Sequence, residues 1–111
     1  MTSCHIKADI WVDGSYLNGI KRVYVEFGDC CEGFMLGPEE AREVADAVES
    51  IAERDPYDPD RGEGLDLYKD GEHLGVCPSG WDVAVRINGV EVIIDWIDSK
   101  ELVGELRRES E

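Results

Sequence analysis

Carboxylates are the side chains of this sequence whose number and spacing could do chemistry. The chain has 26 Asp and Glu against 11 Lys and Arg in 111 residues, so its formal net charge is −15. Eleven of the carboxylates lie between Glu39 and Asp66, where three arginines accompany them. Such a field attracts cationic partners from a distance, although its self-repulsion opposes the compact state. The composition therefore indicates a basic partner surface more directly than it indicates a reaction.

A helix that carries many of these carboxylates is expected to begin at Pro38, a residue suited to the first helical position. Small apolar residues recur at helical spacing from Ala41 to Ala52, which predicts a narrow stripe that packs closely on a sheet. Acidic residues follow about one turn apart, with roughly 5–6 Å between neighbours: Glu39, Glu43, Asp46, Glu49 and Glu53. Nucleic-acid-binding proteins present Lys and Arg to a row of phosphates, so a row of carboxylates can occupy the same basic cleft. A solvated surface helix is the plainer interpretation of this pattern.

The candidate binding site includes two further pairs of carboxylates outside the helix. Asp58 and Asp60 lie in the proline-containing loop that follows the helix. Asp82 and Asp95 form a second candidate patch, because a hairpin turning at Asn88-Gly89 places them directly opposite each other. Like charges across a strand pair are destabilising, so the two aspartates could hold a metal ion, act as a carboxylate pair or meet an Arg or Lys of a partner. Two exposed aspartates on a wet sheet face are the simpler alternative.

Catalytic and metal-binding motifs are lacking in the sequence. His5 and His73 are its only histidines, and it has no Gly-x-Ser-x-Gly elbow, phosphate-binding loop or dinucleotide-binding glycine motif. The cysteines do not show the Cys-x₂-Cys spacing of zinc sites, and without a secretion signal we expect them to be reduced: Cys4, Cys30, Cys31 and Cys77. We therefore expect no enzyme, no cofactor and no metal site. A thiol or metal protein that uses Cys30, Cys31, His73 and Cys77 is a further alternative.

Alternating apolar and polar residues predict the strands that must position these side chains. Two segments alternate with turn signals between them: residues 5–12 and 21–27, separated by Asp13-Gly14 and Asn18-Gly19. Pairing Val12 with Val25, and Ile10 with Phe27, keeps both apolar faces together. The sequence therefore predicts an antiparallel pair at the N-terminus.

Later segments continue the antiparallel pattern. A third short strand is expected near Cys30–Leu36, and two hairpins follow the main helix: Leu65–Val76 turning at Asp70-Gly71, and Trp81–Ile97 turning at Asn88-Gly89. A short helix over Lys100–Arg108, capped by Asp98 or Ser99, is expected to close the chain. This order predicts an α+β fold. It has an antiparallel β-sheet of about five to seven strands, a meander with hairpins, with one main helix on a face and a short C-terminal helix. The length predicts a single domain over residues 1–111.

In size, charge and small α+β layout, the chain resembles phage-encoded inhibitors of the DNA-mimic type, such as anti-restriction and anti-CRISPR proteins. The resemblance is at the level of a class, is carried by composition over the whole chain, and includes no family motif. It implies a protein that inhibits a nucleic-acid-binding host protein or complex, without catalysis, by occupying its basic DNA or RNA site. The alternative is an acidic cytosolic α+β domain whose charge serves solubility or adaptation to high salt.

Charge and hydropathy also predict where the chain is found and what it avoids. Its apolar runs are too short to cross a bilayer, and its N-terminus lacks the basic flank and apolar run of a signal peptide. A strongly negative surface is repelled by anionic lipid and by nucleic acid. We therefore expect a cytoplasmic protein, in the host cytoplasm if it is phage-encoded, whose partner is a basic nucleic-acid-binding protein rather than nucleic acid or membrane.

Overall fold

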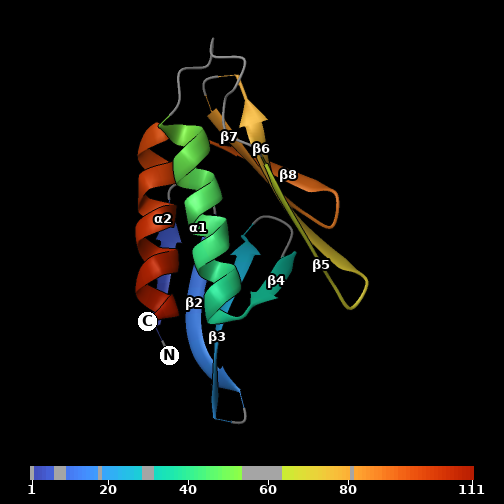
Figure 1. The fold of residues 1–111 in the computed structure, drawn as a ribbon, viewed down its shortest axis with the longest axis vertical. Coiled ribbons are helices and arrows are strands. Elements are labelled where there is room, and N and C mark those ends of the chain that lie inside the picture. The colour runs from blue at the N-terminus through green and yellow to red at the C-terminus, as the bar shows by residue number, and fades with distance from the viewer. Residues whose placement is uncertain (1, 7–9, 18, 29–31, 54–63, 81) are drawn as a thin grey trace.

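Hairpins with tight turns form most of the structure, and two helices of 15 residues each complete it (Figure 1). The computed structural model describes residues 2–6, 10–17, 19–28, 32–53, 64–80 and 82–111. Within these residues the elements, in chain order, are β1 (Thr2–Ile6), β2 (Ile10–Leu17), β3 (Ile20–Phe27), β4 (Gly33–Leu36), α1 (Pro38–Ala52), β5 (Leu65–Lys69), β6 (Glu72–Ser79), β7 (Asp82–Ile87), β8 (Val90–Ile94) and α2 (Trp96–Ser110).

The described strands form two four-stranded sheets, in the orders β1-β2-β3-β4 and β5-β6-β7-β8. Neighbouring strands are antiparallel in both sheets. The predicted α+β class, with antiparallel strands and a C-terminal helix, is therefore confirmed. The strands divide between two sheets, whereas the sequence patterns predicted one.

The backbone conformation of two turns accounts for the hairpins of the second sheet. Asp70 and Gly71 have φ values of 52° and 81°, and Asn88 and Gly89 have values of 50° and 86°. Positive φ at both central residues is what a two-residue type I′ hairpin turn requires, and Asp-Gly and Asn-Gly adopt it most readily. With the predicted turns in place, the first hairpin pairs from Lys69–Glu72 to Leu65–Val76, and the second pairs from Ile87–Val90 to Val83–Ile94.

The N-terminal strands follow the predicted register but not the predicted bounds. Val12 pairs with Val25 and Ile10 with Phe27, as expected. The single strand predicted over residues 5–12 is wrong, because Ile6 pairs with Ile10 across two separate strands, β1 and β2. This register leaves no turn at Asp13-Gly14, one of the two turn signals, because both residues are paired within β2. Leu17 pairs with Ile20 across a two-residue connection, so all of β2 finds partners in β3 and the chain has no need to turn earlier.

The helix α1 begins at Pro38, as predicted, and Glu40 Oε1 accepts a hydrogen bond from the Gly37 amide at 2.9 Å. Its inward stripe is buried: Ala41, Val44, Ala45, Val48 and Ile51. Small side chains allow the helix to approach β3 and β4 of one sheet and β6 and β7 of the other. Because α1 contacts both sheets, their apolar residues join in one core cluster.

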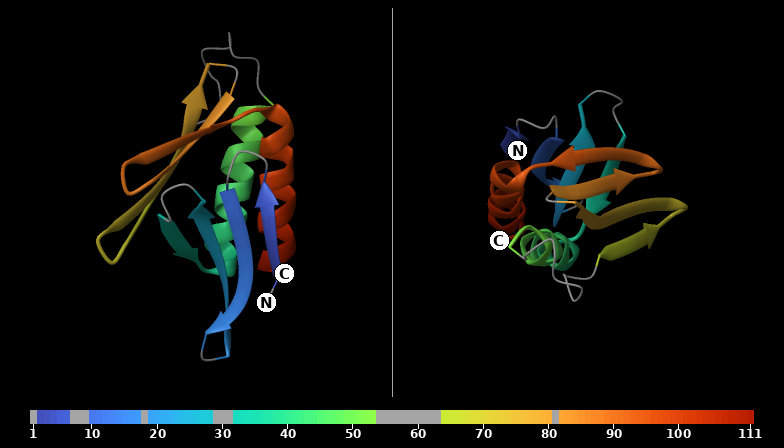
Figure 2. Two further views of the ribbon diagram at one scale, coloured as in Figure 1. Left: turned by 180° about the vertical axis from the view of Figure 1, so that it is seen from behind. Right: turned by 90° about the horizontal axis from the view of Figure 1, so that it is seen from above.

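The helix α2 lies alongside α1 and runs in the opposite direction (Figure 1). Leu102, Val103 and Leu106 bury its inner side. Figure 2 shows the helix pair on one side of the molecule and both sheets on the other. Neither of these two helices, which are those of the described residues, has the length and apolar character needed to span a membrane.

The start of α2 corrects two predictions. The helix begins at Trp96 rather than Lys100, and its N-cap is Asp95, whose Oδ1 accepts a hydrogen bond from the Asp98 amide at 2.8 Å. The expected cross-strand pair of Asp82 and Asp95 is therefore wrong. Asp82 pairs with Ser79 on β6, while β8 ends before Asp95. An aspartate in extended conformation before a helix gains more by capping the free amides than by continuing the strand.

Candidate functional site

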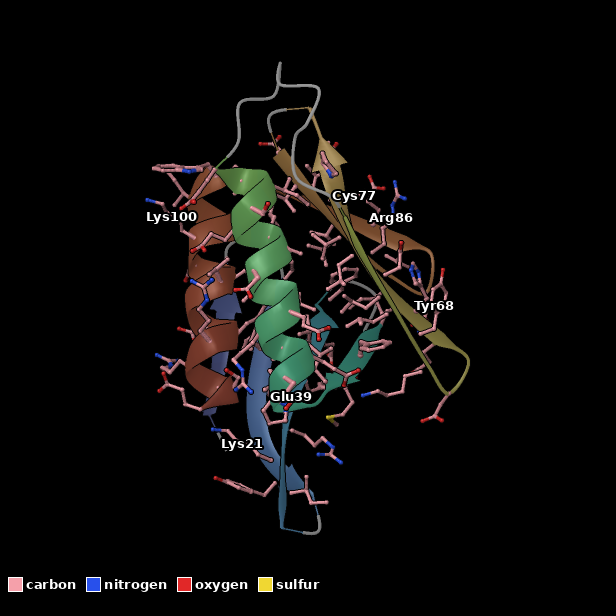
Figure 3. The ribbon with its side chains drawn as sticks, in the orientation of Figure 1. Lys21, Glu39, Tyr68, Cys77, Arg86 and Lys100 are labelled. Carbon is pink, nitrogen blue, oxygen red and sulfur yellow. The ribbon has the colours of Figure 1, made fainter. Side chains whose placement is uncertain are left out.

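Five carboxylates of the candidate binding site lie on α1, away from its buried stripe, and are called here the acidic row: Glu39, Glu43, Asp46, Glu49 and Glu53. Glu49 is half-buried and the others are exposed. At about 1.5 Å of rise per residue, the acidic row extends about 21 Å along the helix. Figure 3 shows Glu39 near the lower end of α1, where the row begins.

Arg107 of α2 binds the middle of the acidic row. Its Nη2 lies 2.9 Å from Asp46 Oδ1, and its Nη1 and Nη2 lie 2.9 and 3.0 Å from the two oxygens of Glu49. Hydrogen bonds from Arg107 lower the pKa of Glu49, and hydrogen bonds to Glu49 and Asp46 raise the pKa of Arg107. The two carboxylates therefore connect α1 to α2, and a large part of their charge is compensated inside the protein.

The other three members of the acidic row are Glu39, Glu43 and Glu53. Each is exposed, and none forms a hydrogen bond or ion pair through its side chain with another described residue. Exposed carboxylates without an internal partner keep their full charge for an external one. These three residues are therefore the part of the acidic row that a cationic surface would meet.

The remaining predicted residues are not gathered with the acidic row. Asp58 and Asp60 lie outside the described residues. Asp82 is half-buried at the start of β7 and interacts with other groups of the protein. Asp95 is engaged as the cap of α2. The two aspartates therefore do not form the cross-strand patch that the sequence predicted, although each stands at an element terminus.

Residues of α2 complete the site, and the sequence pattern missed them. A helix that begins at Lys100 includes neither Trp96 nor Ser99, and the sequence pattern gives Arg107 no partner on α1. One local signal was available: Asp95 followed three residues later by Asp98 is typical of an N-cap with an acidic first turn. The pairing of Arg107 with α1 had no local signal, because the partners are 58 and 61 residues apart.

The residues of the thiol and metal alternative divide between described and undescribed parts of the chain. Cys30 and Cys31 lie outside the described residues. Cys77 is a half-buried free thiol on β6. Among the residues that the structure describes, no three His, Cys, Asp or Glu side chains are grouped closely enough to hold a metal ion.

His73 is engaged by its own hairpin. Its Nε2 lies 2.8 Å from Asp66 Oδ1, and its ring stacks on that of Tyr68 with 4.6 Å between centroids. Gly75 leaves room for this pair, because a Cβ there would lie 3.0 Å from Asp66 Oδ1. His73, Cys77 and Arg86 are among the residues that line a depression of about 230 Å³ on this sheet. Figure 3 labels Cys77 and Arg86, together with Tyr68. A carboxylate and an aromatic ring that orient the imidazole fit a structural role for His73.

Comparison with protein-family models, with curated proteins and with solved structures finds no match for this chain. Its function is therefore inferred from side-chain geometry and charge. In these terms the acidic row is the most extensive feature, because three of its five carboxylates are exposed and unpaired within the described part of the chain, on a helix that is held at several points.

Proposed function

We propose that this chain is a small acidic binding protein that inhibits a nucleic-acid-binding host protein or complex by occupying its basic DNA or RNA site. The observation that carries the proposal is that Glu39, Glu43 and Glu53 are exposed along one helix and have no side-chain partner among the described residues. A site that binds nucleic acid presents Lys and Arg toward a line of negative charges. The outer side of α1 offers such a line without offering phosphate.

Preorganisation of α1 supports this role. Arg42 Nη1 donates a hydrogen bond to the Ser110 carbonyl oxygen at 3.2 Å, near the end of α2. Together with the contacts of Arg107 to Asp46 and Glu49, it connects the helices at two levels. A binding surface that is already ordered pays less conformational entropy when the complex forms. The acidic row is therefore presented on a rigid support.

The first turn of α1 is also held from the second sheet. Lys69 of β5 donates a hydrogen bond to Glu40 Oε1, and a second one to the Met35 carbonyl oxygen at 3.3 Å. Burial raises the pKa of Glu40, but hydrogen bonds from Lys69 and the Gly37 amide lower it by more. Glu40 is thus internally compensated, and its neighbour Glu39 faces outward.

A competition assay tests the proposal. Labelled duplex DNA is bound to purified members of three target classes, a CRISPR effector complex, a restriction enzyme and a DNA-repair glycosylase, with polylysine as a non-specific polycation. We expect the chain to release the duplex from a specific member, as fluorescence anisotropy would show, and less effectively at about 200 mM than at about 50 mM salt. Release from none of the specific proteins, or equal release from polylysine, would contradict the proposal.

Adaptation to high salt makes a different prediction for the same protein. Acidity that serves only solubility or a saline cell requires no partner, and its self-repulsion should unfold the chain at low ionic strength. Circular dichroism between about 10 mM and 1 M salt distinguishes salt adaptation from a binding role. Over this range the Debye length falls from about 30 Å to 3 Å. A chain that stays folded at about 10 mM salt and releases duplex DNA from a target protein fits the binding role.

A further inference from the structure

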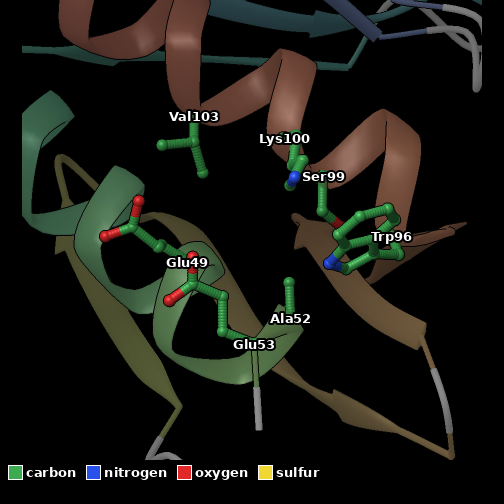
Figure 4. A pocket seen from close by; sticks show the side chains of 7 residues that line it. All are labelled: Glu49, Ala52, Glu53, Trp96, Ser99, Lys100 and Val103. Carbon is green, nitrogen blue, oxygen red and sulfur yellow. The ribbon is translucent and has the colours of Figure 1, made fainter.

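A small cavity lies where the end of α1 meets the beginning of α2 (Figure 4), and is called here the helix-end cavity. Glu49 and Glu53 line it from α1, and Trp96, Ser99 and Lys100 line it from α2. Its volume is about 90 Å³, several times the roughly 10–15 Å³ that one water molecule needs. A planar group of a few heavy atoms therefore fits where a single water would be loosely held.

The α1 wall of this cavity is negative. The last turn of α1 contains no basic residue, so the negative end of its dipole is not offset by a side chain of the helix. Glu53 is exposed and unpaired among the described residues, while the charge of Glu49 is partly compensated by Arg107. Across the cavity, the positive end of α2 is already capped by Asp95. The electrostatics therefore favour a cation.

The α2 wall already holds a cation on an aromatic face. Lys100 Nζ lies 4.0 Å from the centroid of the Trp96 ring, well within the roughly 6 Å over which ring and cation attract each other. Trp96 is 51% exposed, so its ring is accessible from solvent. Lys100 is exposed and has a long, flexible side chain. Its ammonium group can therefore move off the Trp96 ring and leave the ring face to another cation.

The buried hydroxyl of Ser99 is a separate observation that points to a ligand at this cavity. Ser99 is fully buried, and its Oγ has no hydrogen-bond partner among the residues that the structure describes. Buried polar groups are almost always paired, so an exception requires an explanation. In Figure 4, Ser99 lies between Lys100 and Trp96 on the α2 wall. Ser99 lines the cavity, but its Oγ is covered, so the side chain must turn toward the cavity before the oxygen accepts a hydrogen bond from an entering N–H group.

We propose that the helix-end cavity binds an arginine side chain of the partner, an assignment that rests on the proposed function. A guanidinium is planar, stacks on indole, and carries several N–H donors in fixed directions. It can stack on Trp96 in place of Lys100, donate to the Glu53 carboxylate, and donate to Ser99 Oγ. An ammonium group supplies charge without the flat face, and a neutral planar group supplies the face without the charge.

Titration with a small probe tests the proposal independently of any target. N-acetyl-L-argininamide is added to ¹⁵N-labelled chain, and the indole N–H signal of Trp96 is followed by NMR after assignment with a Trp96→Phe variant. The control is N-acetyl-L-citrullinamide, which has the same shape without the charge. We expect a saturable shift with the arginine probe and at least about tenfold weaker binding of the citrulline probe. Equal binding of the two probes, or a shift that never saturates, would overturn the proposal.

Matched variants show whether the cavity or the general negative field is responsible. Glu53→Gln should weaken probe binding about tenfold, whereas Glu72→Gln removes the same charge from an exposed position on β6, outside the acidic row, and should leave binding unchanged. Lys100→Gln removes the internal competitor and should tighten binding. Equal weakening by Glu53→Gln and Glu72→Gln would reduce the effect to diffuse charge and overturn the assignment.

Ser99→Ala examines the unpaired hydroxyl. We expect weaker probe binding with an unchanged or raised melting temperature, because a hydroxyl without a partner contributes no stabilising bond to the free protein. If Ser99→Ala binds the arginine probe as tightly as wild type does, Ser99 takes no part in binding.

The two proposals can fail separately. If the arginine probe binds but no duplex is released from any protein, the proposed function fails. If duplex is released equally by wild type and Glu53→Gln, with no probe binding, the cavity assignment fails.

Discussion

Arg107 binds Glu49 through two parallel hydrogen bonds, with its Nη1 and Nη2 at 2.9 and 3.0 Å from the two carboxylate oxygens. The same guanidinium reaches Asp46 at 2.9 Å. Planar, bidentate pairing fixes direction as well as distance. The acidic row is therefore divided: its middle connects the two helices, and its carboxylates toward both ends have no side-chain partner in the part of the chain that the structure describes.

Removal of Arg107 should loosen the contact between the helices. The Arg107 side chain is 40% exposed, so solvent screens its ion pairs and Arg107→Gln should lower the free energy of unfolding by about 1 kcal/mol or less. The midpoint of urea unfolding measures the change. Arg108→Gln is the matched control, because Arg108 pairs with Glu105 and Glu109 of its own helix. An equal loss in both variants would show that the pairing across helices adds nothing.

Acid should weaken the same connection. Arg107 lowers the pKa of Glu49 below its ordinary value of 4.5, so the stabilisation is present above pH 4.5 and is lost as the pH falls through the folded-state pKa. Falling pH also relieves the repulsion of a chain with net charge −15, which acts in the opposite sense. The difference between wild type and Glu49→Gln isolates the pair. It should shrink below pH 4.5 and disappear in an Arg107→Gln background; a difference that persists there would assign the effect elsewhere.

The cap of α2 makes a sharper prediction. Asp95→Ala leaves the Asp98 amide without its acceptor and should cost about 1 kcal/mol, or a fall of about 4 °C in melting temperature. Asp95→Asn keeps a capping oxygen and should stay close to wild type. Differential scanning calorimetry on the three proteins decides the matter. If Asn is as destabilising as Ala, charge at the helix end rather than the hydrogen bond is what matters.

Partner binding should depend on position along the surface as well as on charge. Glu43→Lys and Glu72→Lys change the net charge equally, and both residues are exposed, but Glu72 lies on β6 in the second sheet. With a target found by duplex release, Glu43→Lys should weaken binding about tenfold or more and reduce its salt dependence, while Glu72→Lys should have little effect. Equal losses would indicate attraction by the whole molecule and would remove the acidic row from the interface.

Sequence patterns predicted the elements whose determinants are local. Asp70-Gly71 and Asn88-Gly89 adopt positive φ because of their own side chains, so two hairpins and their registers could be derived without tertiary information. The start of α1 and its buried stripe followed in the same way from Pro38 and helical spacing. Errors arose where an alternating pattern continued across an element boundary, as in residues 5–12, where Ile6 of β1 pairs with Ile10 of β2.

The amino-acid sequence by itself determined the α+β class, the hairpin turns and the strong negative charge, because each depends on residues close together in the chain or on composition alone. Tertiary structure alone decided which carboxylates pair with a basic residue of another element. Glu49 meets Arg107 across 58 residues, and the cavity between Glu53 and Trp96 exists only because α1 and α2 pack in opposite directions. Helical periodicity specifies the face on which a side chain lies, but it carries no information about which distant residue that face will meet.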